Sequence, residues 1–110
     1  MVTKTQEAFS QGLRISLENE KGIEVAHAYI YIAKNDLHQL PFAFIEDVMV
    51  DESCRGQGLG KKIMQKLIEL ARQYCCYKIV ACSRHNRTQV HKFYSDLGFT
   101  NRGLEFRLDL

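Results

Sequence analysis

The sequence predicts an α/β (α+β) fold in which helices pack on one mixed β-sheet. Apolar residues alternate with polar ones in runs joined by a turn signal, which is typical of an antiparallel hairpin over residues 13–33. A strand, a helix and a second strand then follow between residues 42 and 82, and such a crossover makes its two strands parallel. With 110 residues and 45% apolar content, the chain suits a single domain, residues 1–110, with a small core.

The hairpin is expected because a strand pattern, a turn and a second strand pattern follow one another directly. Leu13, Ile15 and Leu17 alternate with polar residues, as in a half-buried strand. Residues 19–22, Asn-Glu-Lys-Gly, indicate a turn. Residues 23–33 are rich in Ile, Val and Tyr and predict the partner strand.

A third strand is expected over residues 42–50, which are largely apolar but contain adjacent carboxylates. Because side chains alternate along a strand, Glu46 and Asp47 are expected on opposite faces. The alternation places Glu46 with Phe44, Val48 and Val50, and Asp47 with Ile45 and Met49. A charge in an apolar strand is unfavourable unless it is paired or functional. Glu46 is therefore a candidate catalytic residue, and a structural ion pair is the alternative for either carboxylate.

A glycine-rich stretch, Arg55-Gly56-Gln57-Gly58-Leu59-Gly60, joins this strand to a helix expected over residues 59–74. Glycine lets the backbone approach a ligand closely, because it has no Cβ. The start of the helix presents unpaired N–H groups and the positive end of the helix dipole. Together these features predict an anion site suited to phosphate. A tight turn that merely starts a helix is the alternative.

Two nucleotide-binding motifs are excluded at this stretch. A P-loop needs a glycine where Arg55 stands and a Ser or Thr where Lys62 stands. A Rossmann fingerprint needs a third Gly or Ala, but Ile63 holds that position. The following strand also ends without the acidic residue that would bind a ribose hydroxyl.

The rest of the chain is expected to alternate strands and helices. The 59–74 helix has one apolar face, formed by Leu59, Ile63, Leu67, Leu70, Ala71 and Tyr74. Residues 77–82 predict a fourth strand, and the apolar spacing of residues 90–97 predicts a second helix with Gly98 as its C-terminal cap. Alternation of Leu104, Phe106 and Leu108 with charged residues predicts a final strand.

Composition excludes several classes of partner. The net charge is +2, and no basic stripe with interleaved aromatics is present, so nucleic acid is not an expected partner. No signal peptide or long apolar run is present, so no membrane association is expected. The cysteines and histidines lack zinc-binding spacing, so no metal is expected, and the unpaired pattern suits a reduced, cytoplasmic setting. The cysteines are Cys54, Cys75, Cys76 and Cys82.

Two segments resemble signatures of the GNAT acetyltransferase superfamily. Arg55-x-x-Gly58-x-Gly60, after the strand ending Val48-Met49-Val50, resembles the acetyl-CoA pyrophosphate loop of that family. Phe93-Tyr94-x-x-x-Gly98-Phe99 resembles its second signature. The resemblance covers roughly residues 13–110. It implies acetyl-CoA as cosubstrate and a mostly antiparallel sheet, splayed between the third and fourth strands, with flanking helices.

The resemblance also implies roles for particular residues. Glu46 is the expected base for an amine that attacks the thioester, directly or through water, and Tyr94 is the expected acid for the departing thiolate. A core tyrosine beside Phe93 is the alternative for Tyr94. Unpaired backbone groups at the splay would bind the pantetheine arm and polarise the carbonyl. The expected cofactor-binding residues are Val48, Met49, Val50, Arg55, Gly56, Gln57, Gly58, Leu59, Gly60, Lys61, Asn86 and Arg87.

The expected reaction is acetyl transfer to a primary amine of a small molecule. Residues 45–48 and 76–79 look like those of glucosamine-phosphate N-acetyltransferases, although Cys82 stands about where those enzymes carry a carboxylate. Residues 87–94 are closer to bacterial small-amine enzymes, including aminoalkylphosphonate acetyltransferases. A non-catalytic acyl-CoA-binding or regulatory module and a protein N-acetyltransferase remain open alternatives.

A homodimer is also expected. Family members usually begin with a further strand and one or two helices, whereas this sequence starts near the second strand of that plan. Apolar strand surface between Leu13 and Ile32 would then be exposed. Large exposed apolar patches usually mark an interface.

Overall fold

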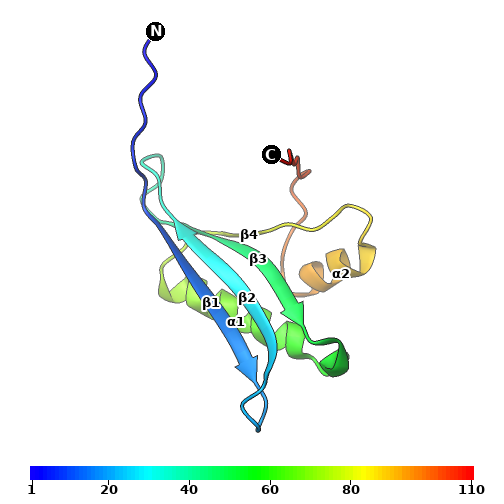
Figure 1. Ribbon diagram of the computed structural model, residues 1–110. Helices are drawn as coiled ribbons and strands as arrows, with labels where there is room; N and C mark the ends of the chain where they lie inside the picture. The colour runs from blue at the N-terminus through cyan, green and yellow to red at the C-terminus, as the bar shows by residue number, and fades with distance from the viewer. The chain divides into compact units, whose positions relative to one another are not determined.

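The computed structural model describes residues 1–110 as two compact units, Met1–Val80 and Ala81–Leu110. The first unit contains strands β1 (Ser10–Glu18), β2 (Glu24–Ala33) and β3 (Phe42–Val50), a short 3-10 helix η1 (Glu52–Cys54) and helix α1 (Leu59–Gln73) (Figure 1). The short strand β4 (Ile79–Ala81) runs across the boundary between the units, and helix α2 (Thr88–Asp96) belongs to the second unit.

The predicted hairpin is confirmed. β1 pairs antiparallel with β2 from Ser10 opposite Ala33 to Glu18 opposite Glu24. The side-chain Oδ1 of Asn19 accepts hydrogen bonds from two backbone N–H groups of the turn, at 2.9 and 3.0 Å. An asparagine that bonds the following backbone in this way closes a turn locally, which explains the sharp reversal.

The sheet has the order β1-β2-β3-β4, with β3 antiparallel to β2. At its other edge, the Ala43 N–H donates to the Lys78 carbonyl at 3.0 Å, and the Tyr77 N–H donates to the Pro41 carbonyl at 2.9 Å. β4 has three residues and β3 has nine, so most of this edge of β3 has no β4 residue to pair with. The short parallel pairing agrees with the splayed strand pair that the resemblance implied.

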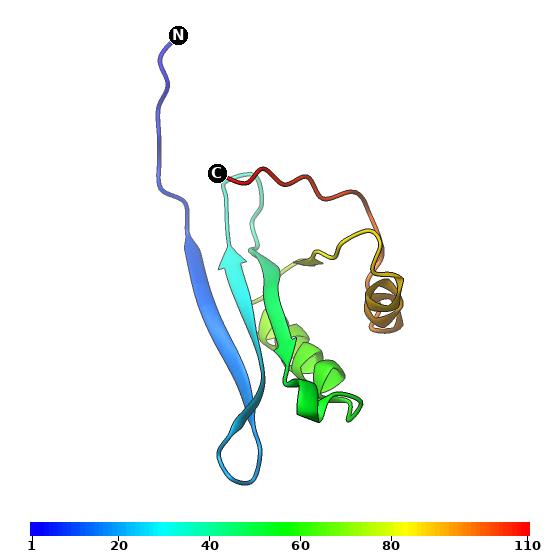
Figure 2. The ribbon, with the colours of Figure 1, turned by 45° about the vertical axis from the view of Figure 1, so that its right-hand side comes forward.

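Helix α1 covers one face of the β1–β3 sheet (Figure 2) and supplies four of the eleven buried core residues. Alternate residues of β2 and β3 lie beneath it, while Ile63, Met64, Leu67 and Ala71 of α1 are buried against them. The fully or nearly buried residues of these strands are Val25, Ala26, Ala28, Ile30, Ile32, Ala43 and Ile45. All the buried residues are apolar, so this packing removes apolar surface from water.

This packing bears on the expected homodimer. Ile30 and Ile32, which belong to the apolar strand surface expected to be exposed, are 0% and 1% exposed. Leu13, Ile15 and Leu17 of β1 are half-buried on the same face. That surface is therefore largely covered within the chain, and the homodimer stays a prediction.

Gly98 terminates helix α2 as predicted, two residues after Asp96, its last helical residue. The N–H of Phe99 donates to the Tyr94 carbonyl, and the N–H of Gly98 donates to the Ser95 carbonyl, both at 3.0 Å. Gly98 has a φ of +98°, which only glycine adopts without strain. These bonds form a Schellman motif, which satisfies carbonyls left over at the helix end.

The predicted final strand is wrong. Residues 101–110 form no strand, and Leu104, Phe106 and Leu108 are 75%, 90% and 83% exposed. Alternation shows only which side chains share a face. A strand also needs a neighbour to pair its backbone groups, and this segment has none in the structure.

Neither helix is long and apolar enough to span a membrane. No cluster of three or more His, Cys, Asp or Glu side chains is placed to hold a metal ion.

Candidate functional site

The loop between β3 and α1 exposes its backbone. Gly56 and Gly58 have φ values of +82° and +77°, a left-handed conformation that residues with a Cβ adopt at a cost. A Cβ built at either position would find no other atom within 4 Å. The space beside both glycines is therefore open, and a ligand can approach the main chain there.

The start of α1 is suited to an anion. Gly58 is the N-cap, no side chain caps the helix, and its first turn contains no acidic residue. The first N–H groups of a helix lack an intrahelical acceptor, so they can donate to an anion. Lys61 and Lys62 are exposed on this turn, and Arg55 lies at the beginning of the loop. A diphosphate fits this set of donors, since it is a dianion or more and has several acceptor oxygens.

Arg55 connects the loop to the end of β3. Its Nε donates to the Val50 carbonyl at 3.4 Å. An open pocket of about 350 Å³ borders both residues, and Met49 and His27 also line it. Val48 and Val50 are half-buried and Met49 is 51% exposed. The end of β3 and the beginning of the loop thus border one pocket within the first unit.

A β-bulge at Asp47 corrects the expected faces of β3. Tyr29 pairs with Glu46, but His27 pairs with Met49, so β3 has one residue more than β2 between these pairs. Asp47 has a φ of +50°, which Asp tolerates better than most residues. Directly opposite residues share a face, so Glu46 lies on the same face as Met49.

The expected grouping of Glu46 with Val50 is therefore wrong. Val50 pairs with Ala26, which is buried under α1. The extra residue of the bulge shifts the alternation by one, and this shift cannot be seen in the apolar pattern of residues 42–50.

Neither carboxylate forms the ion pair that was the structural alternative. Glu46 and Asp47 are both exposed and have no hydrogen-bond or ion-pair partner. Asp47 is instead the extra residue of the bulge, where its backbone is left-handed. Glu46 lies on the face of the sheet turned away from α1, where a molecule from solvent can reach it.

The other expected site residues lie in the second unit. Asn86 and Arg87 are exposed in the loop before α2. Tyr94 lies in α2, where its ring centroid is 5.7 Å from that of Phe93 and 5.4 Å from that of Phe99. Asn86, Arg87 and Tyr94 all belong to the second unit, and their expected roles stay predictions.

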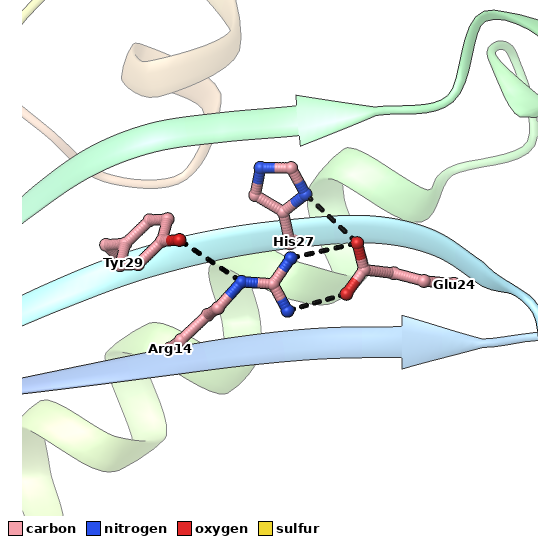
Figure 3. A network of polar contacts seen from close by, with 4 residues as sticks. All are labelled: Arg14, Glu24, His27 and Tyr29. Carbon is pink, nitrogen blue, oxygen red and sulfur yellow. Dashed lines mark hydrogen bonds and ion pairs between the residues drawn. The ribbon is translucent and has the colours of Figure 1, made fainter.

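Sequence reasoning missed a polar network on the open face of β1 and β2 (Figure 3). Arg14 donates from Nη1 and Nη2 to the two carboxylate oxygens of Glu24, at 2.6 and 2.9 Å. Its Nε donates to the Tyr29 hydroxyl at 3.2 Å, and His27 Nδ1 lies 3.3 Å from Glu24. The Arg14 guanidinium holds the pKa of Glu24 below its ordinary value of 4.5. These contacts join residues that are 10 and 15 positions apart in the sequence. Only the register of the predicted hairpin could have shown that such residues meet.

Comparisons with known proteins identify the family of the chain. Residues 6–99 match the model of the acetyltransferase (GNAT) family. A glucosamine 6-phosphate N-acetyltransferase from Trypanosoma brucei brucei is 44% identical over 60% of this chain and 43% of its own length. One from Candida albicans is 31% identical over 81% of this chain and 58% of its own. This chain thus spans about half the length of these relatives or little more.

Solved structures show the same fold. An acetyltransferase from Trypanosoma brucei has a TM-score of 0.83 and 33% identity, over 90% of this chain and 69% of that one. A glucosamine-6-phosphate N-acetyltransferase from Arabidopsis thaliana has a TM-score of 0.77 and 30% identity, over 89% and 66%. With a family match over most of its length and these neighbours, the chain belongs to the GNAT acetyltransferase family.

Proposed function

We propose that this protein binds acetyl-CoA at the β3–α1 loop and transfers the acetyl group to a primary amine of a small molecule. One observation carries the proposal: two left-handed glycines leave open space beside the uncapped N-terminus of a helix that has basic residues and no acid in its first turn. That combination provides donors and charge for a pyrophosphate and room for it to approach.

Different segments of the chain are proposed to bind different parts of CoA. Backbone N–H groups from Gln57 to Lys61 hold the pyrophosphate, and Arg55 adds positive charge beside it. The edge of β3 that faces away from β2, from Val48 to Val50, donates and accepts hydrogen bonds along the pantetheine arm. Of the second unit, Asn86 and Arg87 are proposed to contact the CoA arm as well.

The bond changes balance with two proton-carrying side chains. The amine nitrogen attacks the thioester carbonyl carbon, the carbon–sulfur bond breaks, and the sulfur leaves as a thiolate. Glu46 accepts the proton that the amine must lose, directly or through a water. Tyr94 donates a proton to the thiolate and regains one from water, while the second proton of the nitrogen passes to water as the amide forms. The carboxylate of Glu46 suits its role because it is exposed and unpaired, so no competing ion pair must break first.

The names of relatives suggest the acceptor to test first. Proteins that match over parts of their length are named for glucosamine 6-phosphate, so we propose a phosphorylated amino sugar as the acceptor. Aminoalkylphosphonates are the second choice, because the segment at 87–94 resembles their acetyltransferases.

The test is an acetyl-transfer assay with purified protein, acetyl-CoA and separate acceptors: glucosamine 6-phosphate, an aminoalkylphosphonate and a short peptide with a free amino terminus. Products are detected by mass spectrometry, because a thiol reagent would also react with cysteines of the protein. An acetylated small amine supports the proposal. Acetylation of the peptide alone would indicate a protein N-acetyltransferase, and CoA binding without any product would indicate an acyl-CoA-binding module.

A further inference from the structure

The loop that leads into α2, residues 83–87, is organised around one backbone carbonyl. The carbonyl oxygen of Arg84 accepts a hydrogen bond from the backbone N–H of Arg87 at 3.1 Å and a longer one from the Ser83 hydroxyl at 3.4 Å. A third donor belongs to α2: Nε2 of His91 lies 2.8 Å from the same oxygen. The first two bonds close the loop on itself, whereas the bond from His91 ties it to the helix. We refer to the contact between His91 and the Arg84 carbonyl as the loop anchor.

Helix geometry explains how His91 reaches back to this carbonyl. His91 is the fourth residue of α2, and its own N–H donates to the Arg87 carbonyl at 3.1 Å. Helical Cα–Cβ bonds tilt toward the N-terminus of the helix, so the imidazole extends over the residues that precede it. No side chain caps α2 at Arg87. His91 instead holds the entry of the chain into the helix from one turn inside.

The partner of His91 determines the form of its ring. A carbonyl oxygen has no proton to give, so Nε2 must carry the hydrogen of this bond. In the neutral imidazole only one ring nitrogen is protonated, and Nδ1 is then bare. The loop anchor therefore requires the Nε2–H tautomer, which can be observed directly.

The anchored segment contains two residues that the proposed function needs. Asn86 and Arg87 follow Arg84 in the loop, and both are exposed, so a ligand can reach them. A mobile loop must be ordered when its ligand binds, and this ordering lowers the affinity. A contact that orders the loop beforehand removes part of that cost, without adding any contact to the ligand.

We propose that His91 is a positioning residue for CoA: its Nε2–H holds the Arg84 carbonyl, and this contact keeps Asn86 and Arg87 in the conformation that binds the pantetheine arm. The inference rests on the proposed function, since it concerns the CoA of the same reaction. His91 acts through the loop, and its role requires no contact with CoA, with the amine or with the reacting atoms.

Two substitutions separate the hydrogen bond from the rest of the side chain. Glutamine carries an Nε2–H donor as many bonds from Cβ as histidine does, so His91→Gln can keep the loop anchor. His91→Leu keeps an apolar side chain at this position and has no donor. Lys92→Leu is the matched control, because it removes the neighbouring side chain of α2 and its 2.8 Å ion pair with Asp96 but leaves the loop anchor in place.

Calorimetry with CoA and with ADP measures the effect on binding, because ADP has the diphosphate and lacks the pantetheine arm. The affinity for CoA should fall about two- to tenfold in His91→Leu, the range expected for the loss of one hydrogen bond. It should stay close to that of the unmodified chain in His91→Gln and in Lys92→Leu. The affinity for ADP should be the same in all four proteins. An unchanged CoA affinity in His91→Leu, or an equal loss for ADP and CoA, would overturn the positioning role.

NMR tests the loop anchor without any ligand. Nitrogen–proton correlation spectra of the isotope-labelled chain should show the Nε2–H tautomer in the neutral ring of His91. Backbone relaxation should report increased motion of residues 84–87 in His91→Leu and not in His91→Gln. The Nδ1–H tautomer, or equal loop motion in both variants, would overturn the inference.

The inference and the proposed function fail in different ways. If the unmodified chain binds CoA and acetylates an amine, and His91→Leu does both equally well, the positioning role is wrong and the transferase activity stands. If the unmodified chain binds neither CoA nor ADP, the proposed function is wrong, and the positioning role is overturned with it even where the NMR spectra show the contact.

Discussion

Cys75 occupies at the end of α1 the same left-handed position that Gly98 occupies at the end of α2. Cys75 has a φ of +60°, its N–H donates to the Arg72 carbonyl at 3.0 Å, and the next N–H, of Cys76, donates to the Ala71 carbonyl at 2.9 Å. This is the same pair of Schellman bonds that surrounds Gly98. The motif after α2 therefore has a glycine, which suits this conformation, whereas the motif after α1 has Cys75, whose Cβ makes the conformation unfavourable.

Cys75→Gly should stabilise the protein. The left-handed conformation costs an L-residue about 1–2 kcal/mol, and the exposed Cys75 side chain contributes little packing in return. We expect a gain of roughly 1 kcal/mol in the free energy of unfolding, because the greater chain entropy of glycine offsets part of the relief. Urea unfolding measures it. Cys75→Ser is the matched control, since it removes the thiol and keeps the strained backbone; an equal gain there would assign the effect to the thiol.

Gly58→Val should abolish tight CoA binding. The substitution places a branched side chain in the open space beside the loop, and a φ of +77° strains it further. Calorimetry should show a loss of affinity of at least about tenfold, the equivalent of about 1.4 kcal/mol. Gly22→Val imposes similar strain in the β1–β2 turn, at a φ of +75° and also in open space, and should leave CoA affinity unchanged. Equal affinities in the two variants would place the anion site elsewhere.

Glu46→Gln should change the shape of the pH–rate profile. The amide keeps the size of the side chain and cannot accept the proton of the amine. Turnover should fall most near neutral pH and recover partly at high pH, where the amine loses its proton unaided. Asp47→Asn removes the neighbouring charge and keeps a residue that tolerates the bulge, so its profile should match that of the unmodified chain. A Glu46→Gln profile that is lowered in parallel at every pH would indicate a positioning role.

Tyr94→Phe tests the proposed acid. The variant keeps the ring between Phe93 and Phe99 and loses only the hydroxyl. General acid catalysis is typically worth about 10²- to 10⁴-fold, so single-turnover rates should fall by that order while CoA affinity is kept. Donors with a more acidic leaving thiol should be less affected. Full turnover in the variant would assign Tyr94 to packing alone.

The Arg14–Glu24 pair should make a small part of the stability sensitive to acid. Its partner holds the folded-state pKa of Glu24 below the ordinary value of 4.5. A depressed carboxyl pKa contributes stability that is present above about pH 4.5 and is lost as the pH falls through the folded-state value. Both groups are exposed, so solvent screening keeps the effect small. Thermal unfolding followed below pH 4.5 should show a loss that Arg14→Gln removes; identical pH dependence in both proteins would contradict it.

The sequence determines much of the fold through local patterns. β3 begins and ends at the predicted residues 42 and 50, because a long apolar run between a proline and a turn leaves little choice of boundary. α1 was predicted to within one residue, since its glycine-rich start and apolar stripe are both local signals. The glycines at 56 and 58 adopt the left-handed backbone that a ligand-binding turn requires.

Other features depend on which strands pair and in what register, and the pattern of apolar residues along the chain does not show this. The segment at 104–108 alternates as a strand does, yet forms none, because strand formation requires a neighbouring edge. The contact between Arg14 and Glu24 appears only once the β1–β2 register is known. For the same reason, periodicity could not show that Glu46 lies opposite Tyr29.

The bulge at Asp47 lets β3 hold one extra residue without turning over the residues that follow it. If Asp47 instead took a regular strand position, Val50 would move from the core side to the solvent side, and the loop that follows would leave the sheet from the opposite face. Deleting Asp47 would remove the bulge and keep Val50 opposite Ala26. The direction of the glycine loop thus depends on a bulge upstream of any glycine in it. Among related sequences, a gap at this one position is therefore expected to leave the direction of the loop unchanged.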